Sequence, residues 1–121
     1  MTVREALELT DRRRPNLYSR EEKLRWLSEA EGMVWGALEA FHAVLGPFPG
    51  LESSDWPNKK LLLPQAYTGL YFLWLEGSMY YADQEYLLYN NAMTRFNALW
   101  RDFFAWCCRT IPQPAKSIRY L

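Results

Sequence analysis

The side chains with the greatest nucleophilic potential are a single histidine, His42, and two adjacent cysteines, Cys107 and Cys108. An imidazole beside a thiol is a common covalent catalyst, so an enzyme using His42 and Cys107 is one hypothesis that the sequence leaves open. Cysteines on apolar helices are more often inert packing residues, and neighbours on one helix point in different directions. We therefore expect two free thiols, no disulfide and no enzymatic role.

Glu31 and Glu76 interrupt apolar stretches and could form a carboxylate pair for acid–base or di-metal chemistry. Di-metal helical bundles use Glu-x-x-His motifs on facing helices, and the sequence contains none. An acid on an apolar stripe is more often a hydrogen-bond acceptor for groups such as tyrosine hydroxyls. One histidine beside paired cysteines also lacks the spacing of a zinc site. We expect no metal and no other cofactor.

Two further polar patterns have structural and functional interpretations. Arg12 to Arg14 are either a solvated helix end, where cations complement the helix dipole, or a contact for phosphate or an acidic protein surface. The solvated helix end is favoured. Asn90 and Asn97 recur at heptad spacing in a helix that asparagine does not favour. They are predicted, together with Glu31, to form polar core positions that fix the packing register.

Capping signals predict the first two helices, which must position these groups. Thr2 and Glu5 form a capping box for a short helix that ends near Arg13. Ser19 and Glu22 repeat the signature before a longer second helix. The apolar stripe of that second helix, interrupted at Glu31, is Leu24, Leu27, Val34, Leu38, Phe41 and Leu45.

Residues 46–63 are predicted to form a Pro-rich loop, because prolines and glycines recur too closely for a continuous helix. Long loops in compact domains are usually functional or disordered. Phe48, Leu51 and Trp56 indicate a loop that is partly tied down or that contacts another molecule.

A third helix is predicted to begin near Pro64, and its nearly continuous apolar character is typical of a central helix. Asp83 is the predicted N-cap of a fourth helix that ends near Arg109. Aromatic and apolar residues at alternating spacings of three and four form its predicted core stripe: Tyr86, Tyr89, Met93, Phe96, Trp100, Phe103 and Cys107. Leu99, Phe104 and Trp106 widen this stripe and are predicted to face another subunit.

The sequence thus predicts an all-α fold: a small four-helix domain over residues 1–112, followed by an extended tail over residues 113–121. The first helix is short, the second is long, and the third and fourth form a hydrophobic helical hairpin. Fourteen basic residues balance fourteen acidic ones, which argues against bulk electrostatic binding of nucleic acid or of an anionic membrane. The N-terminus lacks the apolar region of a signal peptide, and apolar runs are shorter than the roughly 20 residues that span a bilayer. We expect a soluble protein.

Two blocks of the chain, Thr2 to Gly32 and Tyr80 to Pro112, resemble the small head–tail connector proteins of long-tailed phages and prophages, also called adaptor or head-completion proteins. The elements that carry the resemblance are Pro15-Asn16, Lys23 to Leu27, Tyr89-Asn90-Asn91, Phe96-Asn97 and Arg109-Thr110. The resemblance implies a non-enzymatic virion protein, assembled in the bacterial host cytoplasm, that forms a ring under the capsid portal around the DNA channel. The implied partners are further copies of the chain, the portal protein and a tail-side completion protein. DNA only passes through the channel, and no membrane is involved.

We therefore predict contacts with neighbouring subunits or the portal from the loop, the flanks of the last helix and the tail. The predicted contact residues are Phe48, Leu51, Trp56, Leu99, Phe104, Trp106, Ile118, Arg119, Tyr120 and Leu121. The alternative hypothesis is a small helical protein-binding or regulatory module that acts on a single host or phage protein through the same aromatic surface.

Overall fold

A computed structural model describes residues 1–41 and 46–110. They form four α-helices, α1 (Val3–Arg13), α2 (Arg20–Phe41), α3 (Gly69–Ala82) and α4 (Tyr86–Thr110), and two short 3-10 helices, η1 (Ser53–Asp55) and η2 (Gln65–Tyr67). These residues contain no strand, and a single antiparallel bridge joins Thr2 to Lys60. The predicted all-α four-helix domain is confirmed, with a short α1 of 11 residues and a long α2 of 22 residues.

Both predicted helix starts are present. The Thr2 hydroxyl accepts a hydrogen bond from the Glu5 amide at 3.2 Å, and the Glu5 carboxylate accepts one from the Thr2 amide at 2.9 Å. The Ser19 hydroxyl accepts a hydrogen bond from the Glu22 amide at 3.1 Å. Each bond satisfies a backbone donor that has no partner inside the helix.

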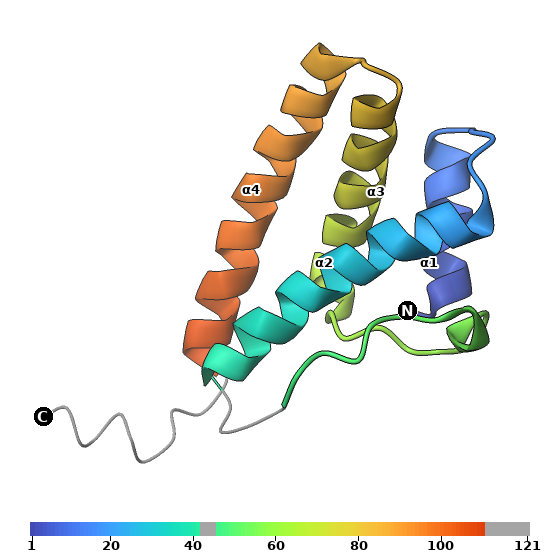
Figure 1. Ribbon diagram of the computed structural model, residues 1–121. Coiled ribbons are helices and arrows are strands. Elements are labelled where there is room, and N and C mark those ends of the chain that lie inside the picture. Colours follow the sequence, from blue (N-terminus) through green and yellow to red (C-terminus); the bar gives the residue numbers. More distant parts are fainter. Residues whose placement is uncertain (42–45, 111–121) are drawn as a thin grey trace, which may run out of the picture.

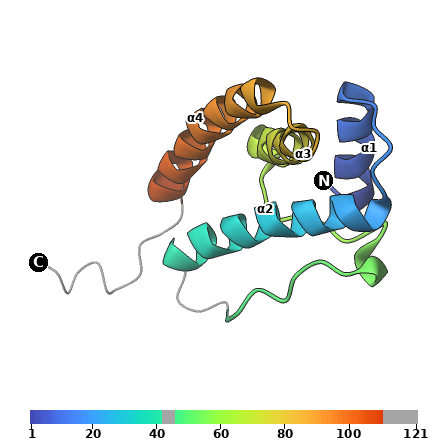
Figure 2. The same ribbon diagram turned by 45° about the horizontal axis from the view of Figure 1, so that its top comes forward.

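The central helix is α3, as its apolar sequence predicts, and it contacts α1, α2 and α4. Figure 2 shows α3 between α1 and α4, and Figure 1 shows α2 crossing in front of α3. Gly77 allows α3 and α4 to approach closely, because a Cβ at this position would overlap the terminal methyl of Met93. The α3 side chains of Leu70, Leu75 and Met79 are buried and belong to the core of the domain.

The turn between α3 and α4 differs from the prediction. Asp83 is the C-cap of α3 and not the N-cap of α4, which begins at Tyr86. The amide of Gln84 donates to the Tyr81 carbonyl and the amide of Glu85 donates to the Tyr80 carbonyl at 2.8 Å, the pattern of a Schellman motif. Gln84 has a φ of 61° in this turn, in the left-handed region where glycine is usual.

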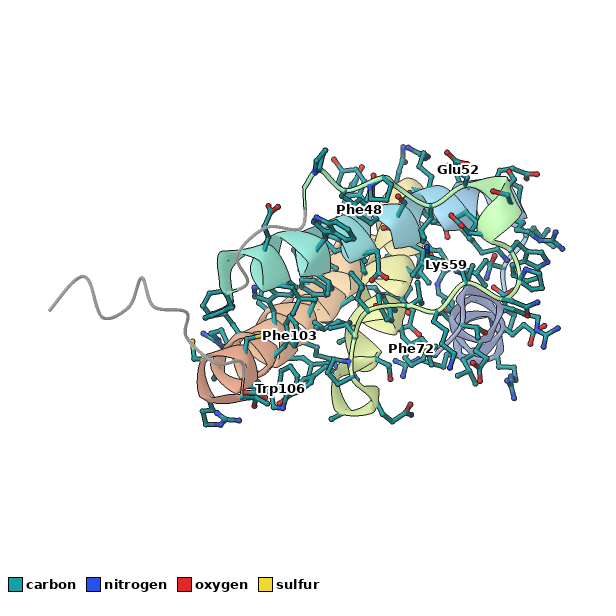
Figure 3. All side chains as sticks on the ribbon, turned by 90° about the horizontal axis from the view of Figure 1, so that it is seen from below. Phe48, Glu52, Lys59, Phe72, Phe103 and Trp106 are labelled. Carbon is teal, nitrogen blue, oxygen red and sulfur yellow. The ribbon has the colours of Figure 1, made fainter. Side chains whose placement is uncertain are left out.

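The loop after α2 is tied to the helices, as its aromatic residues predict. The Phe48 ring packs at Gly32, where an added Cβ would lie 3.3 Å from the ring. The Leu51 amide donates to the hydroxyl of Ser28 at 3.1 Å. Figure 3 shows the labelled Phe48 and Glu52 along α2, and Lys59 nearer α1. The loop therefore forms part of the domain surface.

Only part of the predicted α4 stripe is core. Phe96, Phe103 and Cys107 are buried, whereas the side chain of Tyr86 is 51% exposed. Figure 1 shows the reason: α2 crosses the hairpin near the C-terminal end of α4, and the first turns of α4 extend beyond it. The prediction that Tyr86 belongs to the core is wrong.

Candidate protein-binding surface

The Glu31 carboxylate lies in the core and accepts hydrogen bonds from the Tyr71 hydroxyl at 2.6 Å and the Leu62 amide at 2.8 Å. The Tyr71 hydroxyl in turn accepts a bond from the Leu63 amide at 3.0 Å. Burial raises the pKa of Glu31, and the hydrogen bonds from Tyr71 and Leu62 oppose this rise. The predicted role of Glu31 as a buried acceptor for a tyrosine hydroxyl is confirmed. The carboxylate joins α2, α3 and the end of the loop.

Two arginines of the cluster, Arg13 and Arg14, form ion pairs within the domain. Arg13 binds both carboxylate oxygens of Glu76 at 2.8 and 3.1 Å, which joins α1 to α3. Arg14 binds Asp83 at 2.7 Å and Glu85 at 3.3 Å, which joins the end of α1 to the α3–α4 turn. The predicted solvated helix end fits Arg12 and Arg13, which are exposed in the last turn of α1, whereas the side chain of Arg14 is mostly buried in its ion pairs. Both oxygens of Glu76 pair with Arg13, and Glu31 accepts from Tyr71 and Leu62, so each of the two carboxylates has its own structural partners.

The two cysteines are free, with Cys107 buried and Cys108 exposed, as predicted. Burial raises the pKa of the Cys107 thiol and thus lowers its thiolate fraction. His42 lies outside the described residues. Within residues 1–41 and 46–110, no three His, Cys, Asp or Glu side chains come together as a possible metal site.

Exposed apolar side chains gather at the turn between α3 and α4. Tyr81 is 58% exposed, Tyr86 51%, Leu87 74% and Leu88 41%. We call these four residues the hairpin-end surface, which lies around the top of the hairpin in Figure 1. The side chain of Leu17, in the loop between α1 and α2, is also fully exposed. Exposed leucines and tyrosines gathered in one place are typical of a protein-binding surface.

The hairpin-end surface is held in place by polar and aromatic contacts. Asp83 accepts hydrogen bonds from the Tyr18 hydroxyl and from Arg14, and these bonds lower its pKa. The ring of Tyr81 packs edge-on against the rings of Tyr86 at 5.5 Å and Tyr89 at 5.1 Å. A fixed surface loses less side-chain entropy when a partner binds.

Beside this surface runs a groove of about 480 Å³ between α2, α3 and α4, which we call the aromatic groove. Its lining residues are Glu22, Arg25, Trp26, Glu29, Trp74, Ser78, Tyr81, Ala82, Tyr89 and Met93. Glu22 pairs with Arg25 at 2.8 Å, and Glu29 accepts a hydrogen bond from the Trp74 indole at 3.3 Å. The groove thus combines apolar walls with a rim of net negative charge.

The predicted contacts on α4 are partly occupied within the domain. Trp106 is half-buried, with its ring 5.8 Å from that of Tyr67, and Figure 3 shows it beside Phe103. Leu99 is half-buried and packs at Gly69, where an added Cβ would lie 3.2 Å from it. Phe104 is 40% exposed, the highest exposed fraction of the three.

The remaining predicted site residues have mixed outcomes. Trp56 is half-buried, with the Arg20 guanidinium 4.1 Å from the centre of its ring. Asn90 and Asn97 are exposed on α4, so the prediction that they are polar core residues of this domain is wrong. The predicted contacts in the tail lie outside the described residues: Ile118, Arg119, Tyr120 and Leu121.

The sequence prediction missed Leu17, Leu87 and Leu88. Leu87 and Leu88 do not belong to the heptad stripe of α4, and apolar residues off a stripe are the signal that could have identified them. Leu17 lies between Pro15-Asn16 and the Ser19 cap, where an apolar residue has no helix face to join.

Comparison with protein-family models, with curated proteins and with solved structures found no match to this chain. None of the helices in the described part of the chain is long and apolar enough to cross a membrane.

Proposed function

We propose that this chain is a structural, non-enzymatic virion protein that joins the capsid portal to the phage tail. It assembles as a ring under the portal, around the DNA channel. The observation that carries the proposal is the hairpin-end surface, in which Leu87 is 74% exposed and Tyr81 58% exposed. Large apolar side chains held at one end of a domain are expected to be covered by another protein.

The distribution of apolar surface supports a ring. The hairpin-end surface lies at the N-terminal end of α4, and the half-exposed Phe104 lies near its C-terminal end. Two different surfaces at opposite ends of one element suit a heterologous, head-to-tail contact, which closes into a ring when the rotation permits. Zero net charge suits a channel that must let DNA pass without holding it.

The exposed asparagines also support assembly. Asn90 and Asn97 lie in the block that resembles connector proteins, and their side chains are free to bond to a partner. Asparagine is unfavourable in a helix interior, so its presence on α4 is accounted for when the amides bind a neighbouring subunit or the portal.

The test is mass measurement of the purified chain, alone and with the portal protein of the same phage. A ring or a ring–portal complex is expected. The double substitution Leu87→Ser and Leu88→Ser should weaken assembly at least about tenfold, because it removes apolar area from the contact. Leu62→Ser is the control, since Leu62 is 40% exposed, close to the 41% of Leu88, but lies in the loop. Absence of any complex with the portal, or full assembly of the double variant, would contradict the proposal.

The aromatic groove favours a second candidate, a helical module that binds one host or phage protein. A groove with apolar walls and an acidic rim suits a short basic peptide or helix of such a partner. A discrete one-to-one complex with a protein other than the portal would support this candidate.

A further inference from the structure

We propose that the aromatic groove binds the C-terminal tail, residues 113–121, of a second copy of this chain. The proposal rests on the proposed ring and identifies the contact between neighbouring subunits within it. Three properties carry it: the chemistry of the groove, the composition of the tail and the distance between them along α4.

The groove offers apolar contacts and excess negative charge. Trp26, Trp74 and Tyr89 form apolar walls, and Ser78 and Ala82 leave room between them. The rim carries two carboxylates, Glu22 and Glu29, and one cation, Arg25. Glu22 pairs with Arg25, while Glu29 accepts only the Trp74 indole among the groups described. An occupant should therefore be positively charged and carry apolar side chains at short intervals.

The tail has this composition. It contains Lys116 and Arg119 and no acidic residue, and Ile118 and Tyr120 follow one another at a spacing of two. In an extended segment, residues two apart share one side, so Ile118 and Tyr120 would face the aromatic walls together. Long cationic side chains can reach the carboxylates of a rim while their stems pack on apolar surface. Tail and groove are complementary in charge and in apolar character.

The distance along α4 favours a second copy over the same chain. Met93 lies in the groove and Thr110 ends the helix, seventeen residues or about 26 Å away. Ile118 follows Thr110 by eight residues, which span at most about 29 Å when fully extended. A tail folding back on its own helix must first reverse direction, and a turn takes about four residues. The six residues that then remain before Tyr120 span at most about 22 Å, which is short of Met93. A neighbouring subunit has no such restriction.

The arrangement also explains how a ring would form. The groove lies at one end of α4 and the tail leaves from the other end. Each subunit would give its tail to one neighbour and receive a tail from the other, which is the pattern of a heterologous interface. Of the hairpin-end surface only Tyr81 lines the groove, so Tyr86, Leu87 and Leu88 stay free for the portal or a neighbouring subunit.

The test uses full-length chains in a Cys108→Ser background. One chain carries Ser78→Cys in the groove, and the other carries Ser117→Cys in the tail. After mixing under conditions in which the chain is oligomeric, alone or on the portal, mild oxidation should give the mixed disulfide as the main cross-linked product. Glu8→Cys, at an exposed position on α1, replaces Ser78→Cys as the control and should give little product.

A charge exchange supplies a second measurement. Glu29→Lys in the groove chain should lower the cross-linking yield several-fold, and Lys116→Glu with Arg119→Glu in the tail chain should restore it. An intramolecular disulfide in a dilute chain that carries both cysteines would overturn the assignment to a second copy. A ring that forms on the portal without the mixed disulfide would overturn this inference and leave the proposed function standing. Failure of the chain to assemble at all would overturn both.

Discussion

At the scale of single residues, the Tyr71 hydroxyl joins two buried groups, because it donates to Glu31 and accepts from the Leu63 amide. Tyr71→Phe keeps the ring and leaves both buried groups without this partner. We expect the free energy of unfolding to fall by about 1–3 kcal/mol, measured by urea denaturation. Tyr89→Phe, which removes a hydroxyl from a half-buried tyrosine of the groove, should cost less than about 0.5 kcal/mol. Equal losses would show that the buried hydroxyl of Tyr71 contributes no more to stability than the hydroxyl of Tyr89.

The pKa of Glu31 predicts a pH dependence of stability. Burial raises this pKa above the ordinary value of 4.5, so the folded protein binds the proton more tightly than the unfolded chain. The contribution of Glu31 to stability is therefore fully present below pH 4.5 and is lost as the pH rises through the folded-state pKa. The stability of the wild type relative to Glu31→Gln, whose amide resembles the neutral acid, should fall with rising pH.

Asp83 supplies the opposite trend as a control. Hydrogen bonds from Tyr18 and Arg14 lower its pKa below 3.8, so its contribution is present above pH 3.8 and is lost as the pH falls. Urea denaturation of Glu31→Gln and Asp83→Asn, from below pH 3.8 to neutrality, measures both slopes. Slopes of the same sign would contradict the structural assignment of one of the two carboxylates.

The role of a residue was predictable from sequence where a charged side chain lies on an apolar helix face and needs a hydrogen-bond partner. An acid on an apolar stripe must accept hydrogen bonds, and Glu31 does so. The sequence could not select Tyr71 among eight tyrosines, because the choice depends on how α3 packs against α2. The same limit applies to Arg13, whose partner Glu76 is 63 positions away.

At the scale of elements, the turn between α3 and α4 stores a correctable strain. Gln84 has a φ of 61°, a conformation that costs a non-glycine residue about 1–2 kcal/mol. Gln84→Gly should raise the free energy of unfolding by up to about 1 kcal/mol, since glycine also loses more entropy on folding. Thermal and urea denaturation measure the change. Gln84→Ala keeps a Cβ and should give no gain, so an equal gain for alanine would exclude backbone conformation as the cause.

Element boundaries were predictable where the signal was local. The capping residues Thr2 and Ser19 bond within three positions of themselves, and both helix starts were predicted correctly. Asp83 was assigned to the wrong helix because its partners, Arg14 and Tyr18, are 69 and 65 positions away. The Asp83 carboxylate binds these distant side chains and does not cap α4, and the residues next to Asp83 in the sequence give no sign of this.

At the scale of the whole molecule, periodicity identified the core face of α4 but not where burial stops. The stripe continues through Tyr86, yet α2 crosses the hairpin nearer Phe104, whose ring lies 5.2 Å from that of Phe41. The crossing position depends on tertiary packing. The sequence therefore did not predict the hairpin-end surface, because its exposure depends on the tertiary structure.

Deleting Gln113–Leu121 tests whether the chain can fold normally and still lose its ability to assemble. The described residues form a core in which no buried side-chain nitrogen or oxygen lacks a hydrogen-bond partner, so the shortened chain should keep its helical circular dichroism and its unfolding transition. Its ring or portal complex should weaken at least about tenfold, because the contact loses both cations and the apolar residues of the tail.

The dependence of assembly on salt tests the electrostatic part of the same prediction. Attraction between Lys116, Arg119 and the acidic groove weakens as salt screens it, so assembly of the intact chain should weaken with rising salt. The chain shortened by residues 113–121, and the full-length variant with Lys116→Gln and Arg119→Gln, should both lose much of this dependence. The glutamine variant keeps Ile118 and Tyr120, so it should assemble better than the shortened chain. If the shortened chain assembles as the intact chain does, at low and at high salt, the tail has no part in the contact between subunits.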